Sequence, residues 1–302
     1  MWTKEDIKDQ TGKTIIVTGA NTGIGYETAL ALYEKGANVI IASRDLIKAE
    51  QAADKICKTK SAGSVKTEVL DLTNYESIRN FAVIIQKKHS KIDVLINNAG
   101  IMMPPPGQTA DGHESQFGVN FLGHFALTGL LFPLLKEAGQ ARIVTVSSGA
   151  NVLSAGIDYD NLKLQKSYDA NREYADSKLA NMIFLYELQR RIDQSKGNVL
   201  SVGAHPGVVY TDLQRHIEKE TLKAAFAQFD EVMQPWQGAL PSLFAATVTD
   251  VQGGDYFGPD GAKELTGYPA KSSLISGIAK DTTQGAKLWD YAENATGVKF
   301  IF

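Results

Sequence analysis

The chain is poor in cysteine: its 302 residues contain one, Cys57. A disulfide needs two thiols, so a scaffold held together by disulfides within the chain is excluded. A lone cysteine is typical of a reducing compartment, and we expect Cys57 to be a small, buried or half-buried residue of a helix. The five histidines have no spacing typical of metal ligands, so we expect no metal site.

The chain also lacks an excess of either charge. It has 31 Lys and Arg against 34 Asp and Glu, a formal net charge of −3, and these charges are spread along the sequence. A protein that binds a nucleic-acid backbone would carry a basic block, and none is present. With 43% hydrophobic residues, the composition excludes a disordered chain. We therefore expect a globular protein with no nucleic-acid partner.

Long apolar runs are missing as well. The longest, 125–135, is interrupted by Thr128, Gly129 and Pro133 and is shorter than the roughly 18 residues of a membrane-spanning helix. We expect a buried helix there and no integral membrane association. Residues 1–6 lack the positively charged and then apolar pattern of a secretory signal. The expected location is the cytoplasm.

Short runs rich in β-branched residues alternate with amphipathic segments. The predicted strands are 14–18, 38–42, 65–70, 94–97, 142–147, 199–204 and a weaker 255–257. Apolar residues three and four positions apart predict helices at 25–35, 45–59, 74–89, 115–135 and 171–193. Such alternation indicates a parallel sheet with right-handed crossovers. We expect a single α/β domain, 1–302, with a Rossmann-type doubly wound sheet of about seven strands and helices on both faces.

A glycine-rich loop, 18–25 (TGANTGIG), lies between the first predicted strand and a helix. Glycines let the backbone approach a phosphate, and the N-terminus of a helix presents unpaired N–H groups. An ordinary tight turn would also contain glycines, but the strand before the loop and the helix after it favour nucleotide binding. The residues expected to bind the cofactor here are Gly19, Asn21, Gly23, Ile24 and Gly25.

The end of the second predicted strand indicates which dinucleotide binds. An NAD site places a carboxylate here for the ribose 2′-hydroxyl, whereas this chain has Ser43 and Arg44. A guanidinium pairs with a 2′-phosphate, which a carboxylate would repel. We therefore expect NADP(H) as the cofactor, bound in part by Ser43 and Arg44. Asp45 is expected to cap the next helix.

Tyr174 and Lys178 carry the predicted chemistry. They are four positions apart and so share one face of a helix. Hydride transfer to a carbonyl leaves an alkoxide that needs a proton, which a phenol can supply. An ammonium about 4 Å away favours the phenolate by roughly 4 kcal/mol. We therefore expect Lys178 to lower the pKa of Tyr174 from about 10 toward about 7.

Three more polar residues are expected near this pair. Ser148 ends the fifth predicted strand, where a hydroxyl can reach a substrate oxygen or serve only in a turn. Asn120 lies in an apolar helix, where its amide needs a partner, either in the site or in the core. His205 follows the sixth predicted strand, close to the expected cofactor; a direct catalytic role is open, but we favour a hydrogen bond at the strand end.

Together these motifs resemble the short-chain dehydrogenase/reductase family. Residues 18–25 are similar to its TGxxxGxG motif, 97–100 (NNAG) to its NNAG motif and 174–178 (YADSK) to its YxxxK motif. Residues 206–211 (PGVVYT) resemble the segment beside the nicotinamide, and the resemblance extends over roughly 12–260.

The resemblance implies roles for the site residues. Tyr174 would be the acid/base, Lys178 would lower its pKa and hold the nicotinamide ribose, Ser148 would polarise the substrate carbonyl, and Asn120 would order a proton-relay water. Further cofactor contacts are implied for Asp71 and Leu72 at the adenine, for Asn98 and Gly100 at the ribose side, and for Pro206, Val209 and Thr211 at the nicotinamide end.

Two segments are expected to border the substrate. Ser148 and Tyr174 are 26 positions apart, about twice the commonest family spacing, so 149–172 should form an added loop. This insertion, with 177–181 (SKLAN) and 256–261 (YFGPDG), resembles retinol dehydrogenases, WW-domain oxidoreductases and protochlorophyllide reductases. The segment 212–237 has apolar residues at helical spacing, compatible with a lid or with a helix that packs on the body or on the second subunit of a homodimer.

The residues thus predict an NADP(H)-dependent oxidoreductase that interconverts an alcohol and its aldehyde or ketone on an apolar small molecule. Two alternatives stay open: a non-catalytic NADP(H)-binding regulatory protein, and a reductase of a carbon–carbon double bond that uses the same Tyr174 and Lys178. A serine hydrolase is disfavoured, because the sequence has no Gly-x-Ser-x-Gly motif.

Overall fold

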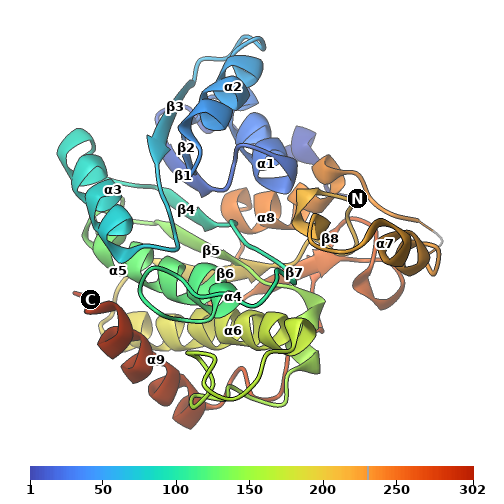
Figure 1. Cartoon of the computed structure of the whole chain (residues 1–302). Coiled ribbons are helices and arrows are strands. Elements are labelled where there is room, and N and C mark those ends of the chain that lie inside the picture. Colours follow the sequence, from blue (N-terminus) through green and yellow to red (C-terminus); the bar gives the residue numbers. More distant parts are fainter. Residues whose placement is uncertain (230) are drawn as a thin grey trace.

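One open sheet of eight strands runs through the computed structural model, which describes residues 1–229 and 231–302 (Figure 1). The strand order is β3-β2-β1-β4-β5-β6-β7-β8. The strands are β1 (Thr14–Thr18), β2 (Asn38–Ser43), β3 (Ser64–Val69), β4 (Val94–Asn97), β5 (Arg142–Val146), β6 (Leu200–Ala204), β7 (Tyr256–Pro259) and β8 (Pro269–Lys271). All neighbours pair in parallel except β7 and β8. The predicted doubly wound α/β sheet is confirmed.

The sheet has one strand more than the seven expected. β8 is three residues long and pairs antiparallel with β7 at the edge of the sheet. Its Pro269 and Lys271 belong to residue types that are uncommon in strands, so the sequence carries no local signal for it. The weakly predicted strand at 255–257 is β7, which continues to Pro259.

Helices cover both faces of the sheet (Figure 1). One face carries α1 (Gly23–Glu34), α2 (Leu46–Ile56) and α8 (Pro235–Thr247), and the other carries α3 (Tyr75–Lys88), α5 (Gly123–Lys136) and α6 (Ala170–Gln194). α9 (Thr282–Thr296) packs on the outer side of α6. An apolar core lies on each side of the sheet. In the core beside α9, the ring of Phe125 lies 5.0 Å from Trp289 and 5.1 Å from Phe300.

The predicted helix at 115–135 is continuous but not uniform. It comprises α4 (Ser115–Phe117), a π-helical turn at Gly118–Leu122 and α5. By length and composition the whole stretch, Ser115–Lys136, could cross a membrane, and it is longer than the apolar run seen in the sequence. Because 83% of its apolar window is buried inside the protein, it forms part of the core, as the prediction of a buried helix stated.

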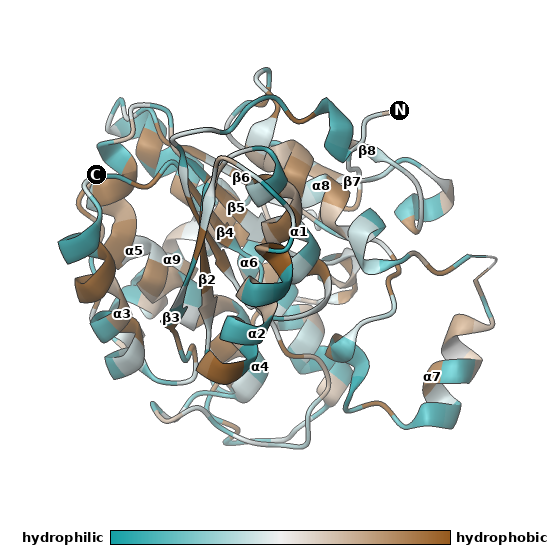
Figure 2. Cartoon of the chain, turned by 90° about the horizontal axis from the view of Figure 1, so that it is seen from above, coloured by the Kyte–Doolittle hydropathy of each residue, from teal (hydrophilic) through white to brown (hydrophobic). Residues whose placement is uncertain are grey.

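The two segments expected near the substrate are largely irregular. The stretch 149–172 contains η3 (Gly149–Leu153) and loop, and its last three residues already belong to α6. The stretch 212–237 contains η4 (Asp212–Gln214), α7 (Lys219–Phe226) and the start of α8, while residue 230 lies outside the described residues. In Figure 2, α7 stands away from the rest of the chain.

The expectation for Cys57 is wrong. Cys57 is exposed because it is the C-cap residue of α2, directly after the last helical residue, where the chain leaves the helix at the surface. The buried side chains of this helix are instead Ala49, Ala52 and Ile56.

Candidate active site

The glycine-rich loop follows β1 at the point where the strand order reverses, which is where α/β sheets bind their ligands. Gly19 has φ +67° and Gly23 has φ +57°, values that side chains disfavour. A Cβ on Gly25 would lie 2.5 Å from Asn98 Nδ2 and 2.6 Å from the carbonyl oxygen of Gly19. Glycine is therefore required at these positions, and the loop keeps its backbone accessible.

This loop fits the diphosphate of a dinucleotide. Thr22, at the N-terminus of the 12-residue helix α1, makes no side-chain hydrogen bond to the first turn. The first N–H groups of α1 are therefore available to an anion, which the helix dipole also favours. The predicted contacts Gly19, Asn21, Gly23, Ile24 and Gly25 all lie in this one loop or on the first turn of α1.

Ser43 connects the end of β2 to the glycine-rich loop. Its hydroxyl donates a hydrogen bond of 3.1 Å to Asn21 Oδ1. Arg44 follows and is exposed, and Asp45 caps α2 by accepting a 3.0 Å hydrogen bond from the backbone N–H of Lys48, as predicted. A guanidinium, and not a carboxylate, therefore extends from the end of β2, while the acidic neighbour is engaged by the helix.

Of the two residues expected at the adenine, Asp71 is half-buried and Leu72 is buried. The carboxylate of Asp71 accepts hydrogen bonds from the N–H (2.9 Å) and the hydroxyl (2.7 Å) of Thr73. Leu72 is only 6% exposed, and its side chain lies against Gly123 of α5. A contact of Leu72 with an adenine would therefore come from its backbone.

The NNAG segment ties the ends of β4 and β1 together. Thr18 Oγ1 accepts hydrogen bonds of 2.9 Å from the N–H groups of both Asn98 and Ala99, and Asn98 Nδ2 donates to the Thr18 carbonyl at 2.8 Å. A Cβ on Gly100 would lie 3.2 Å from Asn120 Oδ1 and 3.8 Å from Lys178 Nζ. Asn98 and Gly100 thus lie between the glycine-rich loop and the predicted catalytic residues.

Helix α6 presents Tyr174 and Lys178 to the ends of β5 and β6. The two side chains are 7% and 5% exposed, and Lys178 Nζ lies 5.7 Å from the centre of the Tyr174 ring. Lys178 Nζ donates a 3.2 Å hydrogen bond to the carbonyl of Val146, the last residue of β5. The Ser148 hydroxyl, which accepts a 3.2 Å hydrogen bond from the N–H of Ala150, lies close enough to Tyr174 to lower the pKa of the phenol. The structure thus brings Tyr174, Lys178 and Ser148 together.

Asn120, in the π-helical turn, is held in place by three hydrogen bonds. Its Oδ1 accepts a 2.9 Å hydrogen bond from the N–H of Ile101, and its Nδ2 donates to the Ile101 carbonyl at 3.0 Å. Nδ2 also donates to Ser177 Oγ at 2.9 Å, which connects Asn120 to α6. Ser177 was not predicted as a site residue, although it lies inside the YxxxK motif.

The expected effect of Lys178 on Tyr174 is wrong for the protein alone. Burial raises the pKa of Tyr174 to about 12, and the nearby Ser148 hydroxyl offsets only part of this rise. Burial also lowers the pKa of Lys178 to about 8. The expectation assumed an ammonium close to the phenol oxygen in a polar medium, whereas both groups lie in the core and Lys178 Nζ points to the Val146 carbonyl.

The segment after β6 forms the remaining part of the site. Val209 is 4% exposed, Pro206 is half-buried, and the side chain of Thr211 caps η4. The hydroxyl of Thr22 donates a 3.0 Å hydrogen bond to Asp212 Oδ2, so the glycine-rich loop touches the start of 212–237. No pattern in the sequence indicates this contact, which joins residues 190 positions apart.

His205 makes the strand-end hydrogen bond that the sequence analysis expected. Its Nε2 lies 2.9 Å from Glu264 Oε2 and 3.2 Å from Ser272 Oγ. Through these partners the end of β6 is connected to Glu264, between β7 and β8, and to Ser272, directly after β8.

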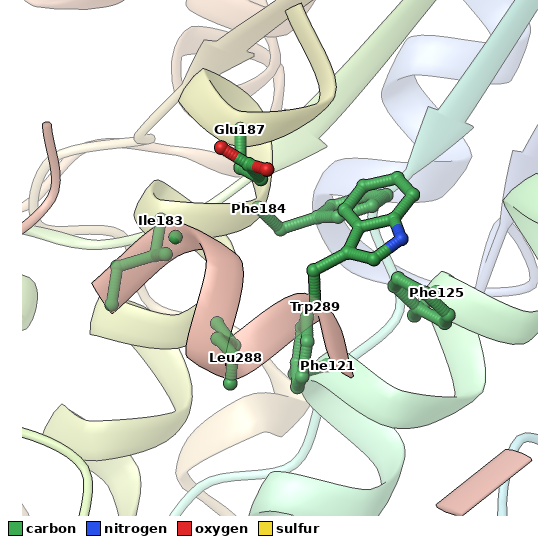
Figure 3. Close-up of a pocket in the computed structure, with 8 residues that line it drawn as sticks. Phe121, Phe125, Ile183, Phe184, Glu187, Leu288 and Trp289 are labelled. Atoms are coloured by element: carbon green, nitrogen blue, oxygen red, sulfur yellow. The ribbon is translucent and has the colours of Figure 1, made fainter. Parts of the chain in front are cut away.

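The crevice shown in Figure 3 lies between α5, α6 and α9, in the aromatic part of the core. It has no room for a water molecule. Its labelled lining residues are Phe121, Phe125, Ile183, Phe184, Glu187, Leu288 and Trp289.

Within residues 1–229 and 231–302, no three acidic, histidine or cysteine side chains are grouped so that they could hold a metal ion.

Comparison with known proteins gives consistent matches. A family model described as short chain dehydrogenase matches residues 13–222. Retinol dehydrogenase 13 of Mus musculus is 40% identical over 298 residues, which cover 95% of this chain and 84% of that protein. Retinol dehydrogenase 11 of Homo sapiens is 40% identical over 290 residues, which cover 95% of this chain and 86% of that protein.

Solved structures agree with the fold. A crystal structure of an uncharacterised protein from Mycobacterium paratuberculosis is 38% identical, with a TM-score of 0.82 over 100% of this chain and 99% of that one. An NADP complex of RhlG from Pseudomonas aeruginosa is 24% identical, with a TM-score of 0.65 over 82% of this chain and 94% of that one.

Proposed function

The chain belongs to the short-chain dehydrogenase/reductase family of oxidoreductases, and from this premise we propose that it is an NADP(H)-dependent enzyme that interconverts an alcohol and its aldehyde or ketone. The proposal depends above all on the cluster of Tyr174, Lys178 and Ser148 beside a glycine-rich loop that fits a diphosphate. Because its relatives are named retinol dehydrogenases, we take apolar alcohols of the retinol type as the first substrate class to test.

In this mechanism a bound NADP(H) supplies or accepts the hydride. Ser148 donates a hydrogen bond to the substrate carbonyl oxygen, and Tyr174 gives its phenolic proton to the same oxygen. Because burial raises the pKa of Tyr174 to about 12, the phenol is protonated at neutral pH, which is the state that carbonyl reduction requires. Lys178, with its pKa lowered to about 8, still carries its charge in most molecules near pH 7 and stabilises the phenolate after proton transfer.

The catalytic role is tested with a pair of tyrosine variants. Purified protein should oxidise NADPH in the presence of retinal or another apolar aldehyde, and Tyr174→Phe should lower kcat by about 10²–10⁴-fold. Tyr186→Phe is the matched control, because Tyr186 lies on the same helix and burial raises its pKa to about 12 as well. If both variants keep the wild-type rate, the proposed mechanism is refuted. A separate measurement, analysis of the product, would distinguish a carbonyl reductase from a reductase of a carbon–carbon double bond.

The choice of NADP(H) over NAD(H) depends on Arg44. A guanidinium that pairs with the 2′-phosphate gains a charge-assisted hydrogen bond, so Arg44→Ala should reduce the preference for NADPH by roughly tenfold or more. Lys58→Ala is the control, since it removes an equal charge from an exposed position at the opposite end of α2. Dissociation constants measured by fluorescence titration decide the question, and equal affinities of the wild type for NADPH and NADH would contradict the assignment.

A further inference from the structure

His124 connects the two halves of the candidate site. It lies on α5, one helical turn after Asn120, and is 3% exposed. Its Nδ1 lies 3.1 Å from the carbonyl oxygen of Asn120, and its Nε2 lies 2.9 Å from the hydroxyl of Thr18. One buried ring therefore spans from the predicted relay asparagine to the residue that begins the glycine-rich loop.

The direction of the two hydrogen bonds made by the His124 ring follows from the chemical groups involved. A carbonyl can only accept, so Nδ1 of His124 carries the hydrogen. Burial lowers the pKa of His124 to about 4, so the ring is neutral and its Nε2 can only accept. The Thr18 hydroxyl therefore donates to Nε2, while its oxygen accepts from the N–H groups of Asn98 and Ala99 at 2.9 Å each. The Thr18 hydroxyl has a second possible acceptor, the Ile96 carbonyl, but this lies farther away at 3.4 Å.

The two residues that His124 connects, Thr18 and Asn120, are each attached to a functional part of the site. At one end, Thr18 precedes Gly19 and holds the NNAG segment through its hydroxyl. At the other end, the π-helical turn that contains Asn120 is attached to Ser177, which lies between Tyr174 and Lys178 on α6. Hydrogen bonds thus run without a break from Thr18 through His124 and the turn of Asn120 to α6, the helix that carries Tyr174. Single π-helical turns are frequent at functional sites.

We propose that His124 is a positioning residue that couples the binding of the dinucleotide at the glycine-rich loop to the placement of Asn120. The proposal rests on the proposed function, because it assigns the two ends of the link to cofactor binding and to proton transfer. The coupling uses the neutral ring with hydrogen on Nδ1, since with hydrogen on Nε2 alone Nδ1 could not donate to the Asn120 carbonyl, and the Thr18 hydroxyl would have to donate to the Ile96 carbonyl at 3.4 Å instead.

Two substitutions separate the two ends of the link. In His124→Asn the amide nitrogen can occupy the place of Nδ1 and keep the bond to the Asn120 carbonyl, while the acceptor for Thr18 is lost. In His124→Gln the amide reaches the place of Nε2 and keeps the bond to Thr18. We expect His124→Asn to weaken NADPH binding by about tenfold with kcat nearly unchanged, and His124→Gln to lower kcat by about tenfold with NADPH affinity nearly unchanged.

Thr296→Val is the control. Thr296 is the last residue of α9, is 2% exposed, donates a 2.7 Å hydrogen bond to the Ala292 carbonyl and accepts one of 3.2 Å from the N–H of Val298. Its loss should lower the melting temperature while it leaves both the NADPH affinity and kcat unchanged. If His124→Asn and His124→Gln behave like this control, or lose affinity and kcat to the same extent, the coupling role is overturned. These two variants retain polar groups in place of the ring, so the test does not depend on an apolar substitution that prevents folding.

The tautomer of His124 provides a second readout that needs no turnover. Nitrogen NMR of the labelled protein, with the His124 signals assigned by their loss in His124→Asn, should show hydrogen on Nδ1 near neutral pH. A ring with hydrogen on Nε2, or a doubly protonated ring near neutral pH, would overturn the proposal. If the protein turned over no carbonyl substrate, the proposed function would fail, while the tautomer and the NADPH affinities would still decide whether His124 links Thr18 to Asn120.

Discussion

Replacing Lys178 with methionine should stabilise the protein and at the same time remove its activity. Burial lowers the pKa of Lys178 from 10.5 to about 8, whereas the unfolded chain has the ordinary value. This difference of about 2.5 pKa units corresponds to about 3 kcal/mol that the buried ammonium costs the fold. Methionine has a similar length and no charge. Because the hydrogen bond to the Val146 carbonyl (3.2 Å) is lost as well, we expect a net gain of about 1–3 kcal/mol in the free energy of unfolding.

The pH dependence makes this prediction specific. Below about pH 8 folding must bury the charged lysine, and the full cost is present. Between about pH 8 and pH 10.5 the native lysine is neutral while the unfolded one is still charged, so the free energy of unfolding of the wild type rises toward that of Lys178→Met.

Calorimetry of both proteins without nucleotide is the assay. The variant should melt about 2–5 °C higher near neutral pH, and the gap should narrow near pH 9.5. A variant that melts below the wild type near neutral pH, or a gap that does not narrow, would refute the reasoning. Turnover and NADPH affinity should both fall in the same variant, because Lys178 lies beside Tyr174 and Gly100.

Two further substitutions test the loop and the core. Gly25→Ala would place a Cβ 2.5 Å from Asn98 Nδ2 and 2.6 Å from the Gly19 carbonyl oxygen, so NADPH affinity should fall by about tenfold or more in a calorimetric titration. Unchanged affinity would show that the loop does not need its close packing. Phe125→Ala removes a buried ring that packs 5.0 Å from Trp289 and should lower the free energy of unfolding in urea by about 3–5 kcal/mol. A loss of less than about 1 kcal/mol would contradict the packing described for this core.

The elements that were predictable from the sequence have strong local signals. The runs of β-branched residues in β1 and β2 indicated the sheet, and the glycines after β1 indicated a tight loop before α1. β8 was missed because its three residues become a strand only through pairing with β7. The π-helical turn at Asn120 was missed because the residues of 118–122 do not differ in kind from those of an ordinary helix.

The spacing of Tyr174 and Lys178 in the sequence predicts where the two residues lie but not their pKa values. The four-residue spacing correctly placed Tyr174 and Lys178 on one face of α6. The direction of the pKa shift of Tyr174 depends on how deeply both groups are buried and on where Lys178 Nζ points, and neither follows from the sequence. For the same reason the link from Thr18 through His124 to Asn120 could not be foreseen, because it joins residues that are 106 positions apart.

The outermost strands of the sheet influence how the molecule meets other copies of itself. An open sheet leaves a row of unpaired backbone groups along each border, and such rows can template the addition of a strand from a neighbouring chain. Here β8 contains Pro269 and Lys271, while β3 carries Lys66 and Glu68. Proline cannot donate the next hydrogen bond, and charged side chains oppose dry stacking. The two edge strands, β3 and β8, therefore resist edge-to-edge aggregation at high protein concentration.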